Sequence, residues 1–256
     1  MRPWLKRTLQ ITGSMVLLVA ACLGAIFYSV VGGNTKITDG ATPAPGVRIV
    51  KDGFVDFGVV DVGEGHVVLI DAGNDRKGAA LLTELTRRKL GPDAVIAIFF
   101  THGHRDHTAG AGLCPNATLY ALDADVALVE GREASHGPLT SMMGAQPTRL
   151  HAHGLKDGAV TTVGATSIRA IAMPGHTAGS AAYLVGGVLF LGDSAGMKTD
   201  GKLAPAPWVF SDDGAKNRAS LVALRKMLES ERAAVVSIVP GHTGTATFED
   251  LTAFAP

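Results

Sequence analysis

The most informative feature of this sequence is a short apolar run followed directly by a cluster of potential metal ligands. Residues 94–100 are apolar and predict a buried strand that ends at Thr101. Four potential ligands then follow within six residues: His102, His104, Asp106 and His107. In an extended loop, ligands two residues apart point to the same side and can share one ion, while Asp106 and His107 can face a second ion. Such imidazole and carboxylate groups are typical ligands of zinc, manganese, iron or cobalt.

Strand-like and helix-like segments alternate along most of the remaining chain. Short apolar runs between glycine-containing turns predict strands at residues 47–50, 53–62, 66–71, 94–100, 118–121, 167–172, 182–185, 188–191 and 234–239. Apolar spacing and charge placement predict helices over residues 76–90 and 215–231. Because the strands come in blocks separated by single helices, the sequence predicts an α/β fold with two sheets and helices outside them.

The first 33 residues predict a membrane anchor. No charged residue occurs between Arg7 and Lys36, and residues 11–31 are almost continuously apolar. A helix of this length spans about 31 Å, close to the thickness of the hydrocarbon core of a bilayer. Three basic residues precede the segment and none directly follows it. This asymmetry predicts a cytoplasmic N-terminus and a catalytic domain outside, which in a bacterium means the periplasm of an inner-membrane protein.

Three fates of this segment stay open from the sequence. The apolar run continues to Val31, which is longer than a cleaved signal and favours a retained anchor. Export after signal cleavage is the second interpretation. The third is lipidation at Cys22, because the sequence Val-Ala-Ala-Cys is similar to a lipoprotein cleavage box. Residues 34–46 contain two prolines and predict a short tether, so residues 47–256 would form the catalytic domain.

Charge and composition exclude several classes of protein. The chain has 23 Lys and Arg against 23 Asp and Glu, and three of the bases lie in the first 33 residues. Residues 34–256 therefore carry 20 bases and 23 acids, a net charge of −3, which argues against a nucleic-acid-binding surface. The two cysteines give no disulfide framework. The sequence carries no signal of an oligomeric state.

Five motifs resemble those of the metallo-β-lactamase superfamily, in the same order. The histidine-rich loop is one; the others are Val-Val-Leu-Ile-Asp-Ala-Gly at 67–73, Pro-Gly-His-Thr-Ala-Gly-Ser at 174–180, Phe-Leu-Gly-Asp at 190–193 and Val-Pro-Gly-His at 239–242. The resemblance runs from about Val47 to Val239 and beyond. It implies an αββα four-layer sandwich with the site along one edge of the two sheets.

The resemblance also implies a dinuclear site, with two zinc ions, or with manganese or iron in their place. Its first metal would be held by His102, His104 and His176. Its second would be held by Asp106, His107 and His242, with Asp193 bridging the two ions. A water between the ions would lose a proton and attack a carbonyl, with Asp106 as the catalytic residue that orients it or carries a proton to the leaving group. The candidates for hydrogen-bonding the ligands are Asp71, Thr101 and Ser180.

An aspartate at the position of Asp193 is similar to the pattern of the thioesterase, lactonase and phosphodiesterase branches, whereas many β-lactam-hydrolysing members lack it. The sequence therefore predicts a membrane-tethered dinuclear zinc hydrolase that cleaves an ester, lactone or thioester in a small-molecule substrate. Three alternatives stay open: a β-lactam-hydrolysing enzyme, an iron-dependent oxidoreductase similar to sulfur dioxygenases, and a non-catalytic metal-binding domain.

A competing motif is Gly-Asp-Ser-Ala-Gly at 192–196, the pattern of a serine esterase. Asp213 and His242 follow Ser194 in the order of an α/β-hydrolase triad, but such a serine must lead directly into a helix, and Gly201 and two prolines follow here. The second His-x-His, at 151–153, is interpreted as the end of a strand. Loop 131–148 with His136, and the segment 203–211 with Trp208 and Phe210, are the predicted walls of the substrate pocket.

Overall fold

The computed structural model describes the backbone of residues 3–255 and all side chains in that range except those of residues 3, 5–9, 29 and 233. Contacts divide the chain into two compact units, with the boundary between Asn34 and Thr35. The first unit is one helix, α1 (Pro3–Val31). Its stretch Gln10–Tyr28 is long and apolar enough to cross a membrane, and none of it is buried.

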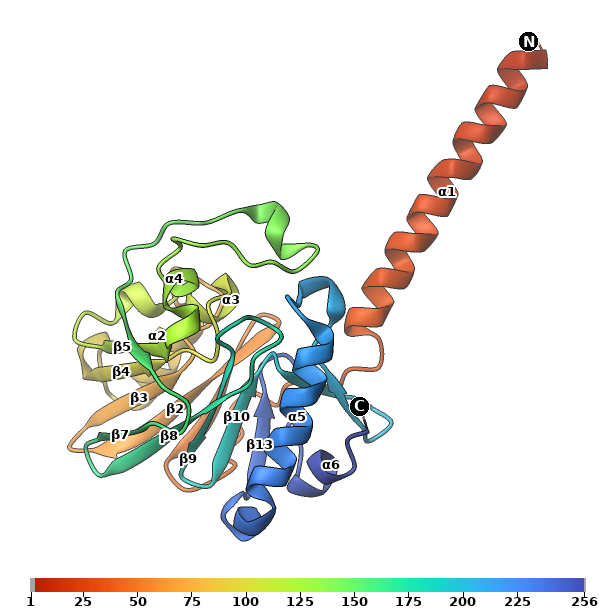
Figure 1. Ribbon diagram of the computed structural model, residues 1–256. Coiled ribbons are helices and arrows are strands. Elements are labelled where there is room, and N and C mark those ends of the chain that lie inside the picture. Colours follow the sequence, from red (N-terminus) through yellow and green to blue (C-terminus); the bar gives the residue numbers. More distant parts are fainter. Residues whose placement is uncertain (1–2, 256) are drawn as a thin grey trace. The chain divides into compact units, whose positions relative to one another are not determined.

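A six-stranded mixed sheet opens the second unit (Figure 1). Its strands lie in sequence order: β1 (Val47–Asp52), β2 (Val55–Gly63), β3 (His66–Ile70), β4 (Val95–Phe99), β5 (Thr118–Leu122) and β6 (Ala152–Leu155). The first three strands pair antiparallel, and β3 to β6 pair parallel. The loops that follow β4 and β5 therefore emerge at the same edge of the sheet.

A second sheet has five strands in the order β13-β10-β9-β8-β7. They are β7 (Val160–Val163), β8 (Thr166–Ala172), β9 (Ala181–Val185), β10 (Val188–Gly192) and β13 (Ser237–Pro240). Only β10 and β13 pair parallel, so β8, β10 and β13 all run in one direction. A two-stranded ribbon, β11 (Ala195–Met197) and β12 (Leu203–Pro205), follows β10.

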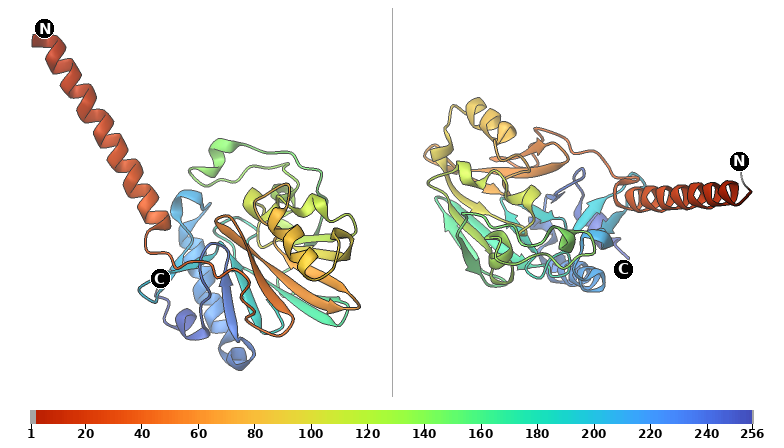
Figure 2. Two further views of the ribbon diagram at one scale, coloured as in Figure 1. Left: turned by 180° about the vertical axis from the view of Figure 1, so that it is seen from behind. Right: turned by 90° about the horizontal axis from the view of Figure 1, so that it is seen from above.

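The sheets pack face to face, with helices on their outer faces (Figures 1 and 2). One core cluster lies between the sheets and includes Phe99, Tyr183 and Phe190. Helix α2 (Ala79–Arg87) buries Leu81 and Leu85 against the outer face of the first sheet. Helices α5 (Gly214–Leu228) and α6 (Phe248–Thr252) cover the outer face of the second sheet. The predicted αββα four-layer sandwich is confirmed.

Short helical segments complete the second unit. Two are single α-turns, α3 (Arg105–Thr108) and α4 (Val126–Val129). The others are 3₁₀ turns: η1 (Pro92–Ala94), η2 (Ala111–Leu113), η3 (Asp123–Asp125), η4 (Thr140–Met143), η5 (Trp208–Phe210) and η6 (Glu229–Ala234). The turn η4 lies within the long loop between α4 and β6, which Figure 1 shows rising away from the sheets.

Several elements differ from the sequence-based expectation. The first predicted helix is shorter, because Gly78 and Lys89 both adopt positive φ angles, of 60°, just outside α2. Strands β7, β11 and β12 were not predicted, and β6 was predicted only as a strand end at residues 151–153, since these strands are three or four residues long and their burial is partial. Sheet pairing supplies their stability, and periodicity over so few residues does not signal it.

The expected tether is residues 34–46, and from Thr35 onward it lies within the second unit. The amide of Thr35 donates to the carbonyl of Met197 at 2.9 Å. Ala44 is buried within the central core, and Ile37 packs against it. The carbonyl of Gly40 accepts a hydrogen bond from Arg48 at 2.8 Å. These contacts make the segment part of the folded unit that begins at Thr35.

Candidate metal centre

The candidate ligands lie on loops that leave the sheets at one edge. The His102–His107 segment follows β4, His176 follows β8, Asp193 follows β10 and His242 follows β13. Since β8, β10 and β13 run in one direction, their C-terminal ends meet at the same edge of the second sheet. The amide of Ala181 donates to the carbonyl of Thr101 at 2.7 Å and joins this edge to the end of β4.

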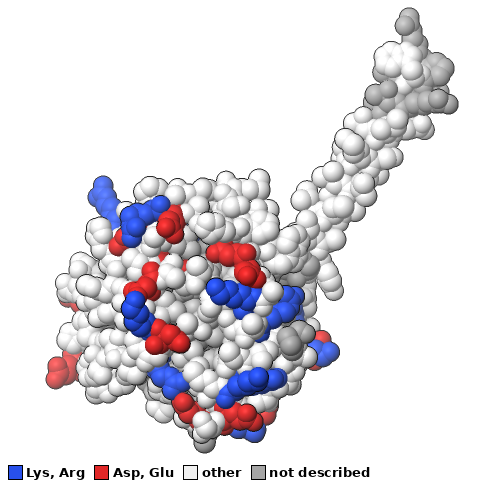
Figure 3. Space-filling model, viewed as in Figure 1, with Lys and Arg blue, Asp and Glu red and all other residues white. Residues whose placement is uncertain are grey.

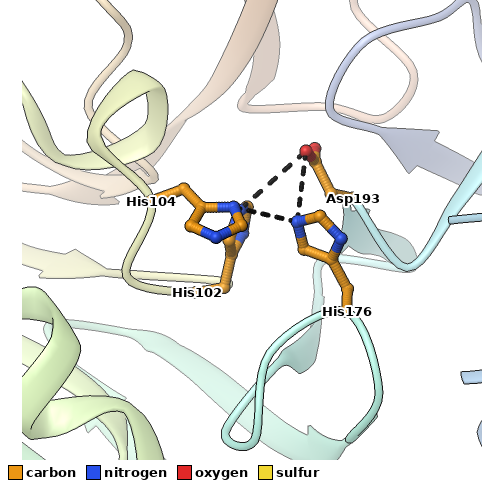
Figure 4. A group of neighbouring side chains, drawn as sticks. All are labelled: His102, His104, His176 and Asp193. Atoms are coloured by element: carbon orange, nitrogen blue, oxygen red, sulfur yellow. Dashed lines mark hydrogen bonds and ion pairs between the residues drawn. The ribbon is translucent and has the colours of Figure 1, made fainter. Parts of the chain in front are cut away.

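Three histidines and one aspartate form the first group, in which His102, His104, His176 and Asp193 point toward one another (Figure 4). One atom from each residue lies within 4.8 Å of the corresponding atom in every other member. The Nδ1 atom of His104 is 3.1 Å from Nε2 of His102 and 3.0 Å from Nε2 of His176. Three ring nitrogens therefore converge beside one carboxylate.

A second group shares Asp193 and adds Asp106, His107 and His242. The Nε2 atom of His242 is 3.0 Å from Oδ2 of Asp193 and 3.3 Å from Oδ2 of Asp106. The Nε2 atom of His107 is 3.1 Å from Oδ1 of Asp193. The structure thus brings together all seven residues that the sequence singled out, with Asp193 common to both groups.

Asp71 orients two of the histidines from outside. Its Oδ2 atom accepts hydrogen bonds from Nδ1 of His107 at 2.8 Å and from the hydroxyl of Thr101 at 2.7 Å. Its Oδ1 atom accepts the amide of Thr101 at 2.7 Å. Because the Thr101 hydroxyl donates to Asp71, Nδ1–H of His102 donates to that hydroxyl at 3.1 Å. Both rings therefore turn their Nε2 atoms toward the centre.

Backbone and hydroxyl oxygens orient two further rings. The Nδ1 atom of His242 donates to the carbonyl of Phe54 at 2.8 Å, and the two rings stack with centroids 5.6 Å apart. The Nδ1 atom of His176 lies 3.3 Å from the hydroxyl of Ser211, which itself donates to the carbonyl of Pro207 at 2.8 Å. In each ring Nδ1 thereby donates outward, and Nε2 faces the centre as the atom that could bind a metal.

These atoms fit a cation better than they fit one another. The Nε2 atom of His107 and Oδ1 of Asp193 are buried, lie 3.1 Å apart and make no hydrogen bond with any described residue. In the first group, His104 Nδ1 faces two ring nitrogens and can donate to only one of them. Ring nitrogens and carboxylate oxygens that converge in this way are the donor set of a divalent transition metal.

The two groups differ in charge. Burial lowers the pKa of His102 well below its usual value and that of His176 to about 3, so the rings of the first group are neutral. Burial alone would also lower the pKa of His107 and His242. Nearby carboxylates, Asp193 above all, outweigh it and raise the pKa of His107 well above its usual value and that of His242 to about 10. The second group therefore attracts positive charge most strongly.

Asp125 is a site residue that the sequence analysis missed. Its Oδ2 atom accepts the amide of Gly103 and the hydroxyl of Thr177, each at 2.8 Å, and its Oδ1 accepts the amide of Gly179 at 2.7 Å. One buried carboxylate thus joins the loop of His102 to the loop of His176. A sequence signal for Asp125 was available, because an acid that follows β5 lies at the same sheet edge as the loop after β4, with which β5 pairs parallel.

Ser180 reaches the ligands only through Thr177. Its hydroxyl accepts the Thr177 amide at 2.9 Å and lies 2.8 Å from the Thr177 hydroxyl. Ser194 is buried, and its hydroxyl has no hydrogen-bond partner among the described residues. Strand β11 rather than a helix follows Ser194, and Asp213 caps α5 by accepting the amide of Lys216. The residues of the serine esterase pattern therefore do not form a triad.

The remaining histidines and the predicted pocket walls lie outside both groups. His151 and His153 are exposed beside and within β6. The amide of His136 donates to Oδ1 of Asp212 at 2.7 Å, so this loop attaches to the segment that contains Trp208. Trp208 itself is 57% exposed.

Comparison with known proteins gives a family match and several relatives. A family model described as the metallo-beta-lactamase superfamily matches residues 50–242. Metallo-beta-lactamase domain-containing protein 1 of Mus musculus is 32% identical over 113 residues, which are 42% of this chain and 43% of that protein. A hydroxyacylglutathione hydrolase of Serratia proteamaculans is 29% identical over 136 residues, which are 53% of this chain and 45% of that protein. The matches thus span less than half the length of these relatives.

Among solved structures, the protein TTHA1623 in a di-iron-bound form shares the fold with a TM-score of 0.58. It is 24% identical, and the superposition covers 81% of this chain and 97% of that one.

Proposed function

Because the chain belongs to the metallo-beta-lactamase superfamily, we propose that it is a dinuclear metal hydrolase that cleaves an ester, lactone or thioester bond of a small molecule. The observation that carries this proposal is the convergence of seven His and Asp side chains in two groups that share Asp193. The similarity to a hydroxyacylglutathione hydrolase supports hydrolysis at a carbonyl.

Each group would hold one ion. In this proposal His102, His104 and His176 bind the first metal, Asp106, His107 and His242 bind the second, and Asp193 bridges them. Bound divalent ions would polarise the substrate carbonyl and lower the pKa of a nearby water. Asp71 and Thr101 would keep two of the ligand rings in the metal-binding tautomer, and Ser180 would act one step further out through Thr177.

Asp106 is the residue proposed to move the proton. Its side chain is 24% exposed, whereas His107 in the same group is fully buried. The Oδ2 atom of Asp106 faces His242, which leaves Oδ1 to take a proton from the attacking water and return it to the leaving group. Asp106 therefore acts at the boundary between the buried ligands and the solvent.

Zinc is the proposed metal, because imidazole nitrogens and carboxylate oxygens are among its usual protein ligands. The same donors also suit manganese and iron. The di-iron form of the similar protein TTHA1623 supports iron as the alternative.

A small-molecule substrate fits the surface better than a nucleic acid does. On the face shown in Figure 3, acidic and basic side chains are interspersed and no broad area carries one sign. Together with the net charge of −3 over residues 34–256, this supports a small-molecule substrate over a phosphate backbone.

We also propose that α1 anchors the enzyme in a membrane, with the catalytic unit on the periplasmic side. The span Gln10–Tyr28 and the basic residues before it support this topology. The first 33 residues would be the anchor, and the hydrolase would begin at the Thr35 contact with Met197. Protease added to intact spheroplasts should then digest the catalytic unit; protection of that unit would overturn the topology.

The first experiment is elemental analysis of the purified protein, followed by assays with lactones, thioesters, esters and β-lactams. About two zinc ions per chain and hydrolysis of an ester, lactone or thioester are expected. Preferential cleavage of β-lactams would replace the proposed substrate class. One iron per chain with oxygen uptake would indicate an oxidoreductase, and two metals without turnover of any substrate would indicate a binding domain.

The substitution Asp106→Asn should lower kcat by at least about a hundredfold while the fold and the first metal are retained. Ser194→Ala is the matched control, because Ser194 lies next to Asp193 in sequence but outside both groups. It should leave kcat unchanged. An unaltered kcat in Asp106→Asn would refute the mechanism, and loss of activity in Ser194→Ala would restore the serine esterase interpretation.

A further inference from the structure

A cavity of about 680 Å³ lies beside the metal centre. His104 forms part of its wall and also belongs to the first group of candidate ligands. The other wall is the long loop between α4 and β6, through residues that include Thr140, Met143 and Pro147. The cavity therefore reaches the residues that would bind the metal beside the reacting carbonyl.

The loop that covers the cavity is attached to the metal centre at its base. The Ser135 hydroxyl and the His136 amide donate to Oδ1 of Asp212, at 3.0 and 2.7 Å. The amide of Asp212 in turn donates to the carbonyl of His176 at 3.0 Å. Further along, the amide of Leu139 donates to the carbonyl of Val209 at 2.8 Å. This wall thus has a defined position relative to the ligands.

Three arginines line this cavity: Arg76, Arg105 and Arg149. None of the three guanidinium groups forms a hydrogen bond or an ion pair with another residue in the described part of the chain. Each of the other eight arginines in the described part of residues 35–255 has such a partner. One carboxylate, Glu133, also lines the cavity, so its charged side chains sum to +2.

The rest of the lining is largely apolar, with Leu113, Leu128, Met143 and Leu150 among its members. An apolar wall favours a hydrocarbon chain, because its burial removes apolar surface from water. A guanidinium offers two parallel N–H donors, which match the two oxygens of a carboxylate. The two features together select a ligand that is apolar along its length and anionic at one end.

Building on the proposed function, we propose that this cavity binds the part of the substrate remote from the scissile bond, and that this part is an aliphatic chain that ends in a carboxylate. Arg76 and Arg149 are the specificity-determining residues. They bind the anionic end while the carbonyl lies at the metal centre. The preferred substrates are then monoesters or monothioesters of dicarboxylic acids.

The test compares two matched esters in the metal-loaded protein, 4-nitrophenyl hexanoate and the mono-4-nitrophenyl ester of adipic acid. They have the same chain length and differ by a terminal carboxylate. The native protein should show a kcat/KM at least about tenfold higher for the adipate ester, the size expected for one charge-assisted contact. This preference should fall as ionic strength rises.

The double variant Arg76→Gln/Arg149→Gln should lose the preference and retain activity on the hexanoate ester. Arg218→Gln is the matched control, because Arg218 lies on α5 and outside this cavity. It should behave as the native protein does. Equal kcat/KM for the two esters in the native protein, or an unchanged preference in the double variant, would overturn the proposal.

A binding measurement separates this proposal from the proposed function. Monomethyl adipate should raise the Tm of the native protein more than methyl hexanoate does, and the double variant should show no such difference. Hydrolysis of neither nitrophenyl ester would count against the proposed activity, while the binding difference would still support the anionic end group. An equal effect of the two methyl esters on Tm would overturn the cavity proposal.

Discussion

Replacing Asp125 by Asn should destabilise the protein and weaken its hold on the first metal. Asp125 accepts three hydrogen bonds, from Gly103, Thr177 and Gly179, at 2.7–2.8 Å. A hydrogen bond to a charged group contributes about 1.5–3 kcal/mol, roughly twice a neutral one. The carbonyl oxygen of an Asn side chain can still accept the hydrogen bonds from Gly103 and Thr177, but without the charge. Its NH₂ group then faces the Gly179 amide, and because both groups are donors this third hydrogen bond is lost.

Losing one charged hydrogen bond and weakening two others would cost about 4–5 kcal/mol. Burial also raises the pKa of Asp125, which shows that ionisation of this carboxyl is costly in the fold. Removing the charge returns part of that cost, so we expect the free energy of unfolding to fall by about 3 kcal/mol. The loops of His102 and His176 would also separate, and metal affinity should drop roughly 10–100-fold.

Denaturant unfolding of the metal-free protein gives the first quantity, and competition with a chromogenic chelator gives the second. Asp123→Asn is the control, because Asp123 lies in the same turn but pairs with the exposed Lys156. It should cost less than about 0.5 kcal/mol and leave metal affinity unchanged. The reasoning is refuted if Asp125→Asn also changes stability by less than about 0.5 kcal/mol and binds metal as the native protein does.

Two further substitutions test contacts away from the ligands. Burial raises the pKa of Glu84, but hydrogen bonds from Arg87 and Arg88 more than compensate and lower it below its usual value. Ionised Glu84 therefore stabilises the fold above pH about 4.5, and this contribution is lost as the pH falls through the lowered pKa. In denaturant titrations Glu84→Gln should cost about 2–3 kcal/mol at pH 7 and progressively less below pH about 4.5; a cost independent of pH would contradict this. Gly192 has a φ of 50°, and a Cβ there would lie 2.3 Å from the Thr101 hydroxyl. Gly192→Ala should lower the free energy of unfolding by about 3 kcal/mol, against about 1 kcal/mol for Gly201→Ala, which has a positive φ in open space; equal losses would show that backbone strain alone is responsible.

Much of the fold was predictable because its elements carry local signals. Apolar strands such as β3 and β4 and the helix α5 are long enough for their periodicity to be read, and a glycine-containing turn predicts the β9–β10 hairpin. The ends of α2 were predicted less well, since the positive φ angles of Gly78 and Lys89 end it earlier than its composition suggests. The segment 35–46 reads as a linker, and only its contacts with Met197 and the central core make it part of the domain.

At the candidate site, the chemistry could be predicted from the amino-acid sequence. The ligand types, the spacing of His102 to His107, and the order of the later motifs are all written in the chain. The arrangement of those groups could not be predicted in this way, because hydrogen bonds between distant loops leave no local sequence pattern. The tautomers imposed by Asp71 and Phe54, the link that Asp125 makes between two loops, and the arginine-lined cavity beside His104 all join segments far apart in sequence.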